Sequence, residues 1–301
     1  MIKDLDLGSE VVDEWIKDLE SEVTSKLAED NKDILDGPVS STDVSYNSYL
    51  INTLAAINIA VFLFELASPV KSSDAGILSL PLLFGAKINE LILNGEWWRL
   101  ITPKFLHSGL LHIAFSSWAL LTFGPLVDTA YGSFAFCMIY FLGGVCGNLM
   151  SFFHTPDATV GGTGPVLAII GSWIIYLFQN REALGEEMAD NLIQKVAVAS
   201  VLSVALSYLT PIDDWTHLGA ACAGLIFGVF ICPVVPVHAP SKKLSYDPND
   251  SQEGFLLVSQ WPDARKLFTV FTLFVVTLVS LFFVLAPVVT EFHLSDMSNS
   301  F

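Results

Sequence analysis

Residues 160–171 read VGGTGPVLAIIG, a glycine-rich turn that leads directly into an apolar run. Gly161 and Gly162 let the backbone turn tightly, and Pro165 suits the first turn of a helix, where its missing N–H is not needed. Thr163 therefore stands at the start of a predicted helix that is apolar enough to lie in a membrane. Two interpretations fit this position: a helix-capping hydroxyl, or a nucleophile at a helix start.

The composition of the chain is that of a membrane protein. Of its 301 residues, 52% are hydrophobic and 15% are charged, whereas soluble domains carry about 25% charged residues. The net charge is −17, and residues 1–45 alone hold 13 acidic and 4 basic side chains. This balance argues against nucleic acid as a partner, because nucleic-acid binding needs clustered Lys and Arg.

Seven apolar stretches have about the length that crosses a bilayer, roughly 20 residues at 1.5 Å each. They lie near residues 47–67, 108–128, 132–153, 159–178, 192–210, 214–236 and 266–290. The sequence thus predicts an all-α, multi-pass integral membrane protein. Its expected parts are a soluble acidic extension at 1–45, a six-span core at 46–236, a polar linker at 237–264, a seventh span at 265–290 and a tail at 291–301.

The connection between the first two spans, residues 68–107, is unusually long. About 40 residues are too many for a structureless connector, and Trp97 and Trp98 are typical of a membrane–water interface. We expect this segment to be partly helical and to lie in the interface.

The N-terminal extension carries a second pattern. Between residues 9 and 29, apolar side chains recur at three- and four-residue steps, which predicts an amphipathic helix with an acidic polar face. Such a helix is typical of a solvated segment or of a contact with a soluble partner. The first residues have neither the apolar region of a secretory signal nor the composition of a transit peptide. If the protein is imported into an organelle, its targeting segment is expected to lie outside the sequence given.

The cysteines give no sign of a metal site. All four fall within apolar stretches, where a cysteine acts as a small hydrophobe, and they form no Cys-x-x-Cys pair or His/Cys cluster. We therefore expect neither a metal ion nor a cofactor.

Three polar residues fall at a similar depth in three different spans. Spans two, four and six run in the same direction, and His112, Thr163 and His217 are each the fourth or fifth residue of their span. Ionisable residues at membrane depth usually face an internal cavity, although each histidine alone can also tie its span to a loop. A hydroxyl beside a histidine is the minimum for nucleophilic catalysis, because a base must take the proton of the attacking alcohol. The shared depth favours a site.

Small residues predict how two of these spans meet. Gly224 and Gly228 form a Gly-x-x-x-Gly pair in the sixth span, which lets helix backbones approach closely. Close packing of spans four and six brings Thr163 and His217 together. Backbone N–H groups near Gly161 and Gly164, at the helix start, are candidate donors to a developing oxyanion.

The stretch from Trp98 to Gly228 resembles the rhomboid family of intramembrane serine proteases. Four segments carry the resemblance: WWRLITPKFLHSGLLHIAFSSWALLTFGPLVDTAYG with its Trp-Arg pair (Trp98, Arg99) and His-x4-His, YFLGGVCGNLMS, VGGTGPVLAIIG and DDWTHLGAACAGLIFG. The seventh span resembles the "6+1" arrangement of eukaryotic members. The whole sequence is similar to plant plastid members, which implies a chloroplast membrane.

The resemblance also assigns site residues, and two of them depart from the family pattern. It implies a catalytic dyad at Thr163 and His217, with Thr163 in place of the family's serine. It implies oxyanion donors at His112 and Ser116, with Ser116 in place of an asparagine. The threonine methyl group restricts χ1 and crowds the base, and Thr nucleophiles typically use their own N-terminal amine as base. Losing an oxyanion donor typically costs about 10²–10³ in rate.

These departures predict a rhomboid-like pseudoprotease that binds transmembrane segments of client proteins within the lipid bilayer. The alternative is an active intramembrane endopeptidase with Thr163 as nucleophile and His217 as base. A channel or transporter is a third class. It is disfavoured because the sequence shows no inverted repeat and no chain of buried acids.

Overall fold

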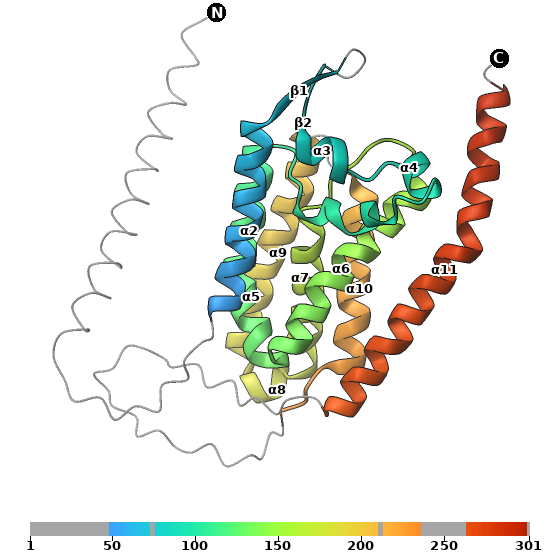
Figure 1. Ribbon diagram of the computed structural model, residues 1–301. Coiled ribbons are helices and arrows are strands. Elements are labelled where there is room, and N and C mark those ends of the chain that lie inside the picture. Colours follow the sequence, from blue (N-terminus) through green and yellow to red (C-terminus); the bar gives the residue numbers. More distant parts are fainter. Residues whose placement is uncertain (1–47, 73–75, 210–212, 236–262, 300–301) are drawn as a thin grey trace, which may run out of the picture. The chain divides into compact units, whose positions relative to one another are not determined.

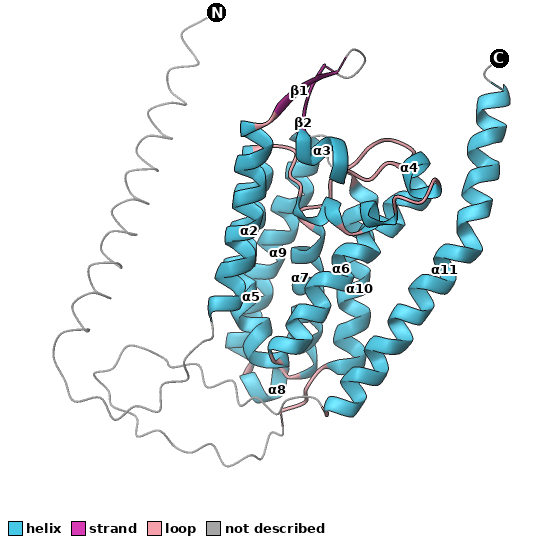
Figure 2. Ribbon diagram, in the orientation of Figure 1, coloured by secondary structure: helices cyan, strands magenta, loops and turns pink. Residues whose placement is uncertain are grey.

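The computed structural model describes residues 48–72, 76–209, 213–235 and 263–299 (Figure 1). Within them the regular secondary structure is helical apart from one short hairpin and an isolated bridge, and loops connect the elements (Figure 2). The long helices are α2 (Ser48–Ala67), α5 (Leu110–Tyr131), α6 (Ser133–His154), α7 (Gly164–Gln179), α9 (Glu186–Leu209), α10 (Asp214–Ile231) and α11 (Ala264–Asn299), with the single turn α8 (Arg181–Leu184) before α9. Each predicted span corresponds to one long helix, so the all-α fold is confirmed. The extension at 1–45 and the linker up to residue 262 lie outside the described residues.

Five of these helices are long and apolar enough to cross a bilayer: α2, α5, α6, α10 and the Ala264–Val288 part of α11. The apolar helix α7 has only 16 residues, because the chain turns at Gly161–Gly162 before the helix begins. Helix α9 starts at Glu186, ahead of the predicted apolar stretch. Helix α11 continues to Asn299, so the predicted tail is helical for most of its length. The chain is an integral, multi-pass membrane protein.

Helix α7 is the central helix of the bundle. It packs against α5, α6, α9 and α10 (Figure 1), and residues 164–173 are all buried. The Tyr131 hydroxyl of α5 donates to the Ser172 carbonyl at 2.8 Å, and the rings of Trp173 and Tyr176 stack with their centroids 5.0 Å apart. This packing fixes the position of the helix start, where Thr163 lies.

Helices α7 and α10 are in backbone contact. A Cβ atom on Gly224 would overlap the carbonyl oxygen of Ala168, and one on Gly228 would lie 2.8 Å from the Cβ of Ile175. Such contact is open only to glycine at these positions. The predicted close packing of the fourth and sixth spans is therefore present in the structure.

The 68–107 segment is partly helical, as expected, and also contains a hairpin that the sequence did not predict. Strands β1 (Pro69–Ser72) and β2 (Gly76–Ser79) pair antiparallel, with Pro69 opposite Ser79. The segment continues as α3 (Leu80–Gly85), α4 (Asn89–Leu93), η1 (Trp97–Leu100) and η2 (Thr102–Phe105). The strands have four residues each, too few for a period-two pattern to stand out from the apolar flanks.

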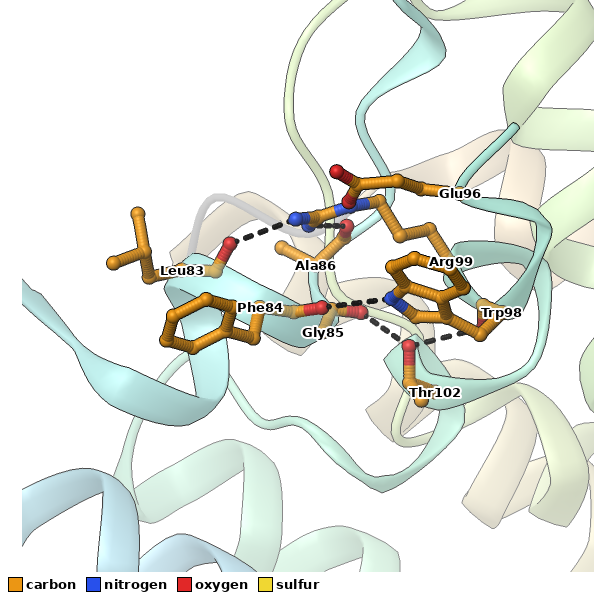
Figure 3. A network of polar contacts seen from close by, with 8 residues as sticks. All are labelled: Leu83, Phe84, Gly85, Ala86, Glu96, Trp98, Arg99 and Thr102. Atoms are coloured by element: carbon orange, nitrogen blue, oxygen red, sulfur yellow. Dashed lines mark hydrogen bonds and ion pairs between the residues drawn. The ribbon is translucent and has the colours of Figure 1, made fainter. Parts of the chain in front are cut away.

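Side chains of η1 and η2 satisfy the end of α3. The carbonyls of residues 83–86 all accept side-chain hydrogen bonds (Figure 3). Arg99 donates to two of them at 2.9 Å each and pairs with Glu96 at 2.6 Å. The Trp98 indole N–H donates to a third at 3.2 Å, and the Thr102 hydroxyl donates to the fourth at 2.7 Å. The Trp-Arg pair thus has a structural role, because a helix end otherwise leaves its last carbonyls unpaired.

An Arg99→Lys variant should lose about 1–3 kcal/mol of stability. A lysine ammonium cannot donate to both carbonyls in the fixed geometry of the planar guanidinium, so one buried carbonyl is left unpaired. Thermal unfolding in detergent micelles measures the effect. The control is Arg181→Lys, since the Arg181–Asp190 ion pair is exposed and contributes little. Equal unfolding midpoints for the two variants would contradict this role of Arg99.

Candidate functional site

Thr163, His112 and His217 meet at the start of α7. The Thr163 hydroxyl oxygen lies 2.5 Å from Nε2 of His217 and 3.1 Å from Nε2 of His112. Thr163 is 2% exposed and His112 is fully buried, whereas His217 is partly exposed. Three helices that are distant in sequence therefore place two imidazoles on one hydroxyl.

Ser108 fixes which nitrogen of His112 carries the proton. The backbone N–H of Ser108 donates to Nδ1 of His112 at 3.1 Å, so Nδ1 is an acceptor and Nε2 carries the hydrogen. His112 consequently donates to the Thr163 oxygen, and Nε2 of His217 lies within hydrogen-bond distance of the same hydroxyl. His217 is placed to accept the proton that a nucleophile at Thr163 would lose.

The capping interpretation of Thr163 is wrong. Thr163 occupies the N-cap position of α7, but its backbone is helical (φ −84°, ψ −17°) and its side chain makes no cap hydrogen bond. A capping side chain normally needs an extended backbone to reach the N–H groups of the first turn. Here the hydroxyl is directed at the two histidines instead.

The backbone offers one N–H at the helix start. The Gly164 N–H donates to the Gly161 carbonyl at 3.0 Å, and Pro165 has no N–H. Within the described residues, the Thr163 N–H has no recorded acceptor. It is the candidate backbone donor to an oxyanion.

Ser116 and His107 hold the turn before Thr163. The Ser116 hydroxyl donates to the Gly162 carbonyl at 3.0 Å, and the Gly162 N–H donates to Leu106 at 3.0 Å. A Cβ atom on Gly162 would overlap the ring of His107. Burial lowers the pKa of His107 to about 4, although a hydrogen bond to the Phe105 carbonyl opposes the shift. Neutral His107 is thus a packing partner of the turn.

Asn148 is a site residue that sequence reasoning missed. Its side-chain nitrogen donates to the Leu100 carbonyl at 2.9 Å, and its oxygen lies where a Cβ atom on Gly161 would be. The Gly161 N–H donates to Pro103 at 2.9 Å. The signal in the sequence was a lone Asn inside the apolar third span, because polar groups at membrane depth seldom lack a function.

Asp213 positions the helix that carries His217, and it was also missed. Its carboxylate accepts from the Trp215 N–H at 3.2 Å and from the hydroxyls of Thr216 and Thr155 at 2.8 and 2.9 Å. Burial alone would raise the pKa of Asp213, but hydrogen bonding from Ser151 together with these three groups outweighs burial and lowers the pKa. An Asp just before an apolar helix is a recognised start signal, so this cap was accessible from sequence.

Lys87 joins the 68–107 segment to the same region. Its backbone pairs with Thr159 in both directions at 3.0 Å, and its ammonium donates to the Thr155 carbonyl at 2.5 Å. Burial lowers the pKa of Lys87 to about 8, partly offset by Asp213 and Asp157. The segment therefore supports the chain that leads into the Gly161–Gly162 turn.

The described residues contain no group of three or more His, Cys, Asp or Glu side chains arranged to hold a metal ion. In the arrangement above, neither nitrogen of His112 has a free lone pair, because one accepts a hydrogen bond and the other carries a hydrogen. The site is therefore organised around hydrogen bonds to a hydroxyl.

Comparison with known proteins identifies the same region. The family description "Rhomboid domain" matches residues 94–234. The chain is 51% identical over 238 residues to RHOMBOID-like protein 9, chloroplastic, of Arabidopsis thaliana, a match that covers 78% of this chain and 53% of the relative. It is 37% identical over 147 residues to the rhomboid protease GluP of Bacillus subtilis (strain 168), covering 49% and 28% of the two chains. It is 31% identical over 143 residues to YdcA of the same bacterium, covering 47% and 70%. The chain thus spans about half the length of the plant relative.

Proposed function

The chain belongs to the rhomboid family, and we propose that within it the chain is a catalytically impaired member that binds transmembrane segments of client membrane proteins. Rhomboid proteins work in the lipid bilayer on transmembrane substrates. In this proposal the chain still binds transmembrane segments but does not cleave them efficiently. Because RHOMBOID-like protein 9 is named as chloroplastic, we propose a chloroplast membrane as the location.

The main support for the proposal is that both side chains at the oxyanion-donor positions already donate hydrogen bonds to other groups of the protein. His112 donates its one available hydrogen to Thr163, and Ser116 donates to the carbonyl of Gly162. A developing oxyanion would therefore find neither side chain free. Each missing donor typically costs about 10²–10³ in rate.

The threonine adds a second defect. Thr163 is 2% exposed and lies against His217, so the β-methyl group of a threonine adds bulk where a serine would leave room for an incoming carbonyl. A β-branched side chain is also stiff about χ1, so the hydroxyl has little freedom to swing from the histidines toward a substrate. The site retains the contacts of a dyad in an environment that opposes attack.

One observation favours the alternative, an active intramembrane endopeptidase. The Thr163 hydroxyl and Nε2 of His217 lie 2.5 Å apart, a distance suited to transfer of the hydroxyl proton to a base. In this alternative Thr163 attacks, His217 takes its proton, and the Thr163 N–H supplies the oxyanion contact.

A fluorophosphonate probe separates these functions, because it reacts with an activated hydroxyl irrespective of substrate. The unaltered chain should remain unlabelled, whereas Thr163→Ser should be labelled through its unhindered hydroxyl. Intact-mass spectrometry of the purified chain measures the adduct. Thr163→Ser combined with His217→Ala is the control and should lose the label. An adduct on Thr163 of the unaltered chain would overturn the impaired-protease proposal.

A further inference from the structure

A pocket of about 420 Å³ lies behind His112, on the side of the first span. It is bounded by the end of α2, the β1–β2 hairpin, the start of α3 and the loop that leads into α5. Its walls are apolar except for Glu65, Ser79, His107 and Ser108. We call it the Glu65 pocket.

Glu65 is a buried carboxylate with little compensation from the protein. It is 7% exposed, and the one hydrogen bond recorded for it within the described residues comes from the His107 N–H at a long 3.4 Å. Removing a carboxylate from water costs several kcal/mol unless a partner compensates, and acids at membrane depth generally mark functional sites. A hydrogen-bond donor on a molecule bound in the pocket would therefore stabilise the carboxylate.

The pocket is in direct contact with the candidate site. Ser108 lines the pocket and also holds Nδ1 of His112. His107 lines the pocket and packs against Gly162, the residue before Thr163. An occupant of the pocket would thus touch two residues that position the hydroxyl and its imidazole.

The chemistry of the walls selects the occupant. Apolar walls with one buried carboxylate suit a primary ammonium group on an aliphatic stem, which is the side chain of lysine. Among the described residues, no Lys or Arg lines the pocket, so the phosphate of an aminophospholipid headgroup would lie unpaired near a carboxylate. Walls without a cation therefore favour a lysine over a lipid amine.

The depth of the pocket agrees with this occupant. Glu65 lies two residues before the end of α2 at Ala67, close to where that span leaves the bilayer. Lysines that flank a transmembrane segment lie at this boundary, where the aliphatic stem stays in apolar surroundings and the ammonium reaches a polar partner. Two of the lining residues, Leu66 and Leu110, are 65% and 72% exposed, so apolar side chains border the pocket at the surface.

We propose that the Glu65 pocket binds a lysine side chain that flanks the transmembrane segment of a client. The inference rests on the proposed function, since it requires that clients bind. It adds a recognition contact for them on the first-span side of His112.

The test uses the full chain in phosphatidylcholine vesicles and two synthetic peptides. Each peptide has a transmembrane run of Leu and Ala, and the flanking position is Lys in one and Gln in the other. Energy transfer between labelled protein and labelled peptide measures binding. The unaltered chain should bind the Lys peptide at least about tenfold more tightly, the effect of one charge-assisted hydrogen bond. Glu65→Gln should remove this preference.

Matched variants make the result specific. Glu90→Gln alters an exposed acid on α4 and should leave the preference intact. Leu78→Trp fills the pocket from β2 without changing Glu65 and should abolish the preference.

Three results would overturn the inference. Equal affinity of the unaltered chain for the two peptides overturns it and leaves client binding standing. No binding of either peptide overturns the proposed function as well. Loss of the preference when phosphatidylethanolamine is added identifies a lipid amine as the occupant.

Discussion

A chain that carries both Thr163→Ser and Ser116→Asn should cleave a transmembrane reporter at least about 10²-fold faster than the unaltered chain. The serine lacks the β-methyl group of Thr163. Its hydroxyl would keep the position of the Thr163 hydroxyl, which lies within hydrogen-bond distance of His217. The asparagine adds an amide donor one helical turn after His112, where a serine is committed to Gly162. One oxyanion donor alone is worth about 10²–10³ in rate.

Reporter cleavage in liposomes, followed by gel and mass spectrometry, measures this gain. Each single substitution should gain less than the pair, because both defects act in the same step. The double variant with His217→Ala added is the control and should return to background. A double variant no faster than that control would mean that the site differs from an active one in more than these two residues.

The second large effect concerns the contact between α7 and α10. Gly224→Ala should lower the free energy of unfolding by about 1–3 kcal/mol or more, because overpacking a rigid interface forces the helices apart. The added methyl group would overlap the Ala168 carbonyl, a backbone atom that cannot rotate away. Since Thr163 begins α7 and His217 lies on α10, the same displacement should abolish the cleavage gained by the double variant.

Thermal unfolding and reporter cleavage, both measured in the double-variant background, test this expectation. Cys222→Val is the matched control, because Cys222 faces an open apolar groove on the same helix and its enlargement should leave both readouts near their starting values. If Gly224→Ala behaved like the control, the close approach of the two helices would not be what holds the dyad together.

The sequence predicted the parts of the fold that depend on local hydrophobicity and on the alternating direction of successive spans. Seven apolar runs predicted seven helices, since a bilayer requires a minimum length of apolar helix. The alternation of span direction then placed His112, Thr163 and His217 at one depth. The 2.5 Å contact between Thr163 and His217 depends on the close packing of α7 and α10 at Gly224, which the Gly-x-x-x-Gly pattern also indicated.

The sequence did not predict the hydrogen-bond partners of side chains that could bond to several different groups. The capping interpretation of Thr163 failed, because the backbone is already helical at that position and the hydroxyl bonds to two distant histidines. Ser116 was known as a substitution, yet its bond to Gly162 depends on a turn from a different span. Such choices are set by tertiary contacts, which propensity and spacing do not contain.

Two networks were missed for a similar reason. Lys87 pairs with Thr159, and Asn148 abuts Gly161, across long separations in sequence. Each carries a polar group inside or beside an apolar region, which is a general sign of function, but only the folded chain identifies the partner. Glu65 belongs to the same group, since it meets the His107 N–H across 42 residues of sequence.

The most direct test of the central claim is the cleavage activity of the unaltered chain. A transmembrane reporter is reconstituted in liposomes with the purified chain, and cleavage is compared with that by His217→Ala under the same conditions. Equal, background-level cleavage by both proteins is the result expected of an impaired protease. Cleavage by the unaltered chain that disappears in His217→Ala would contradict the claim and establish Thr163 and His217 as a working dyad.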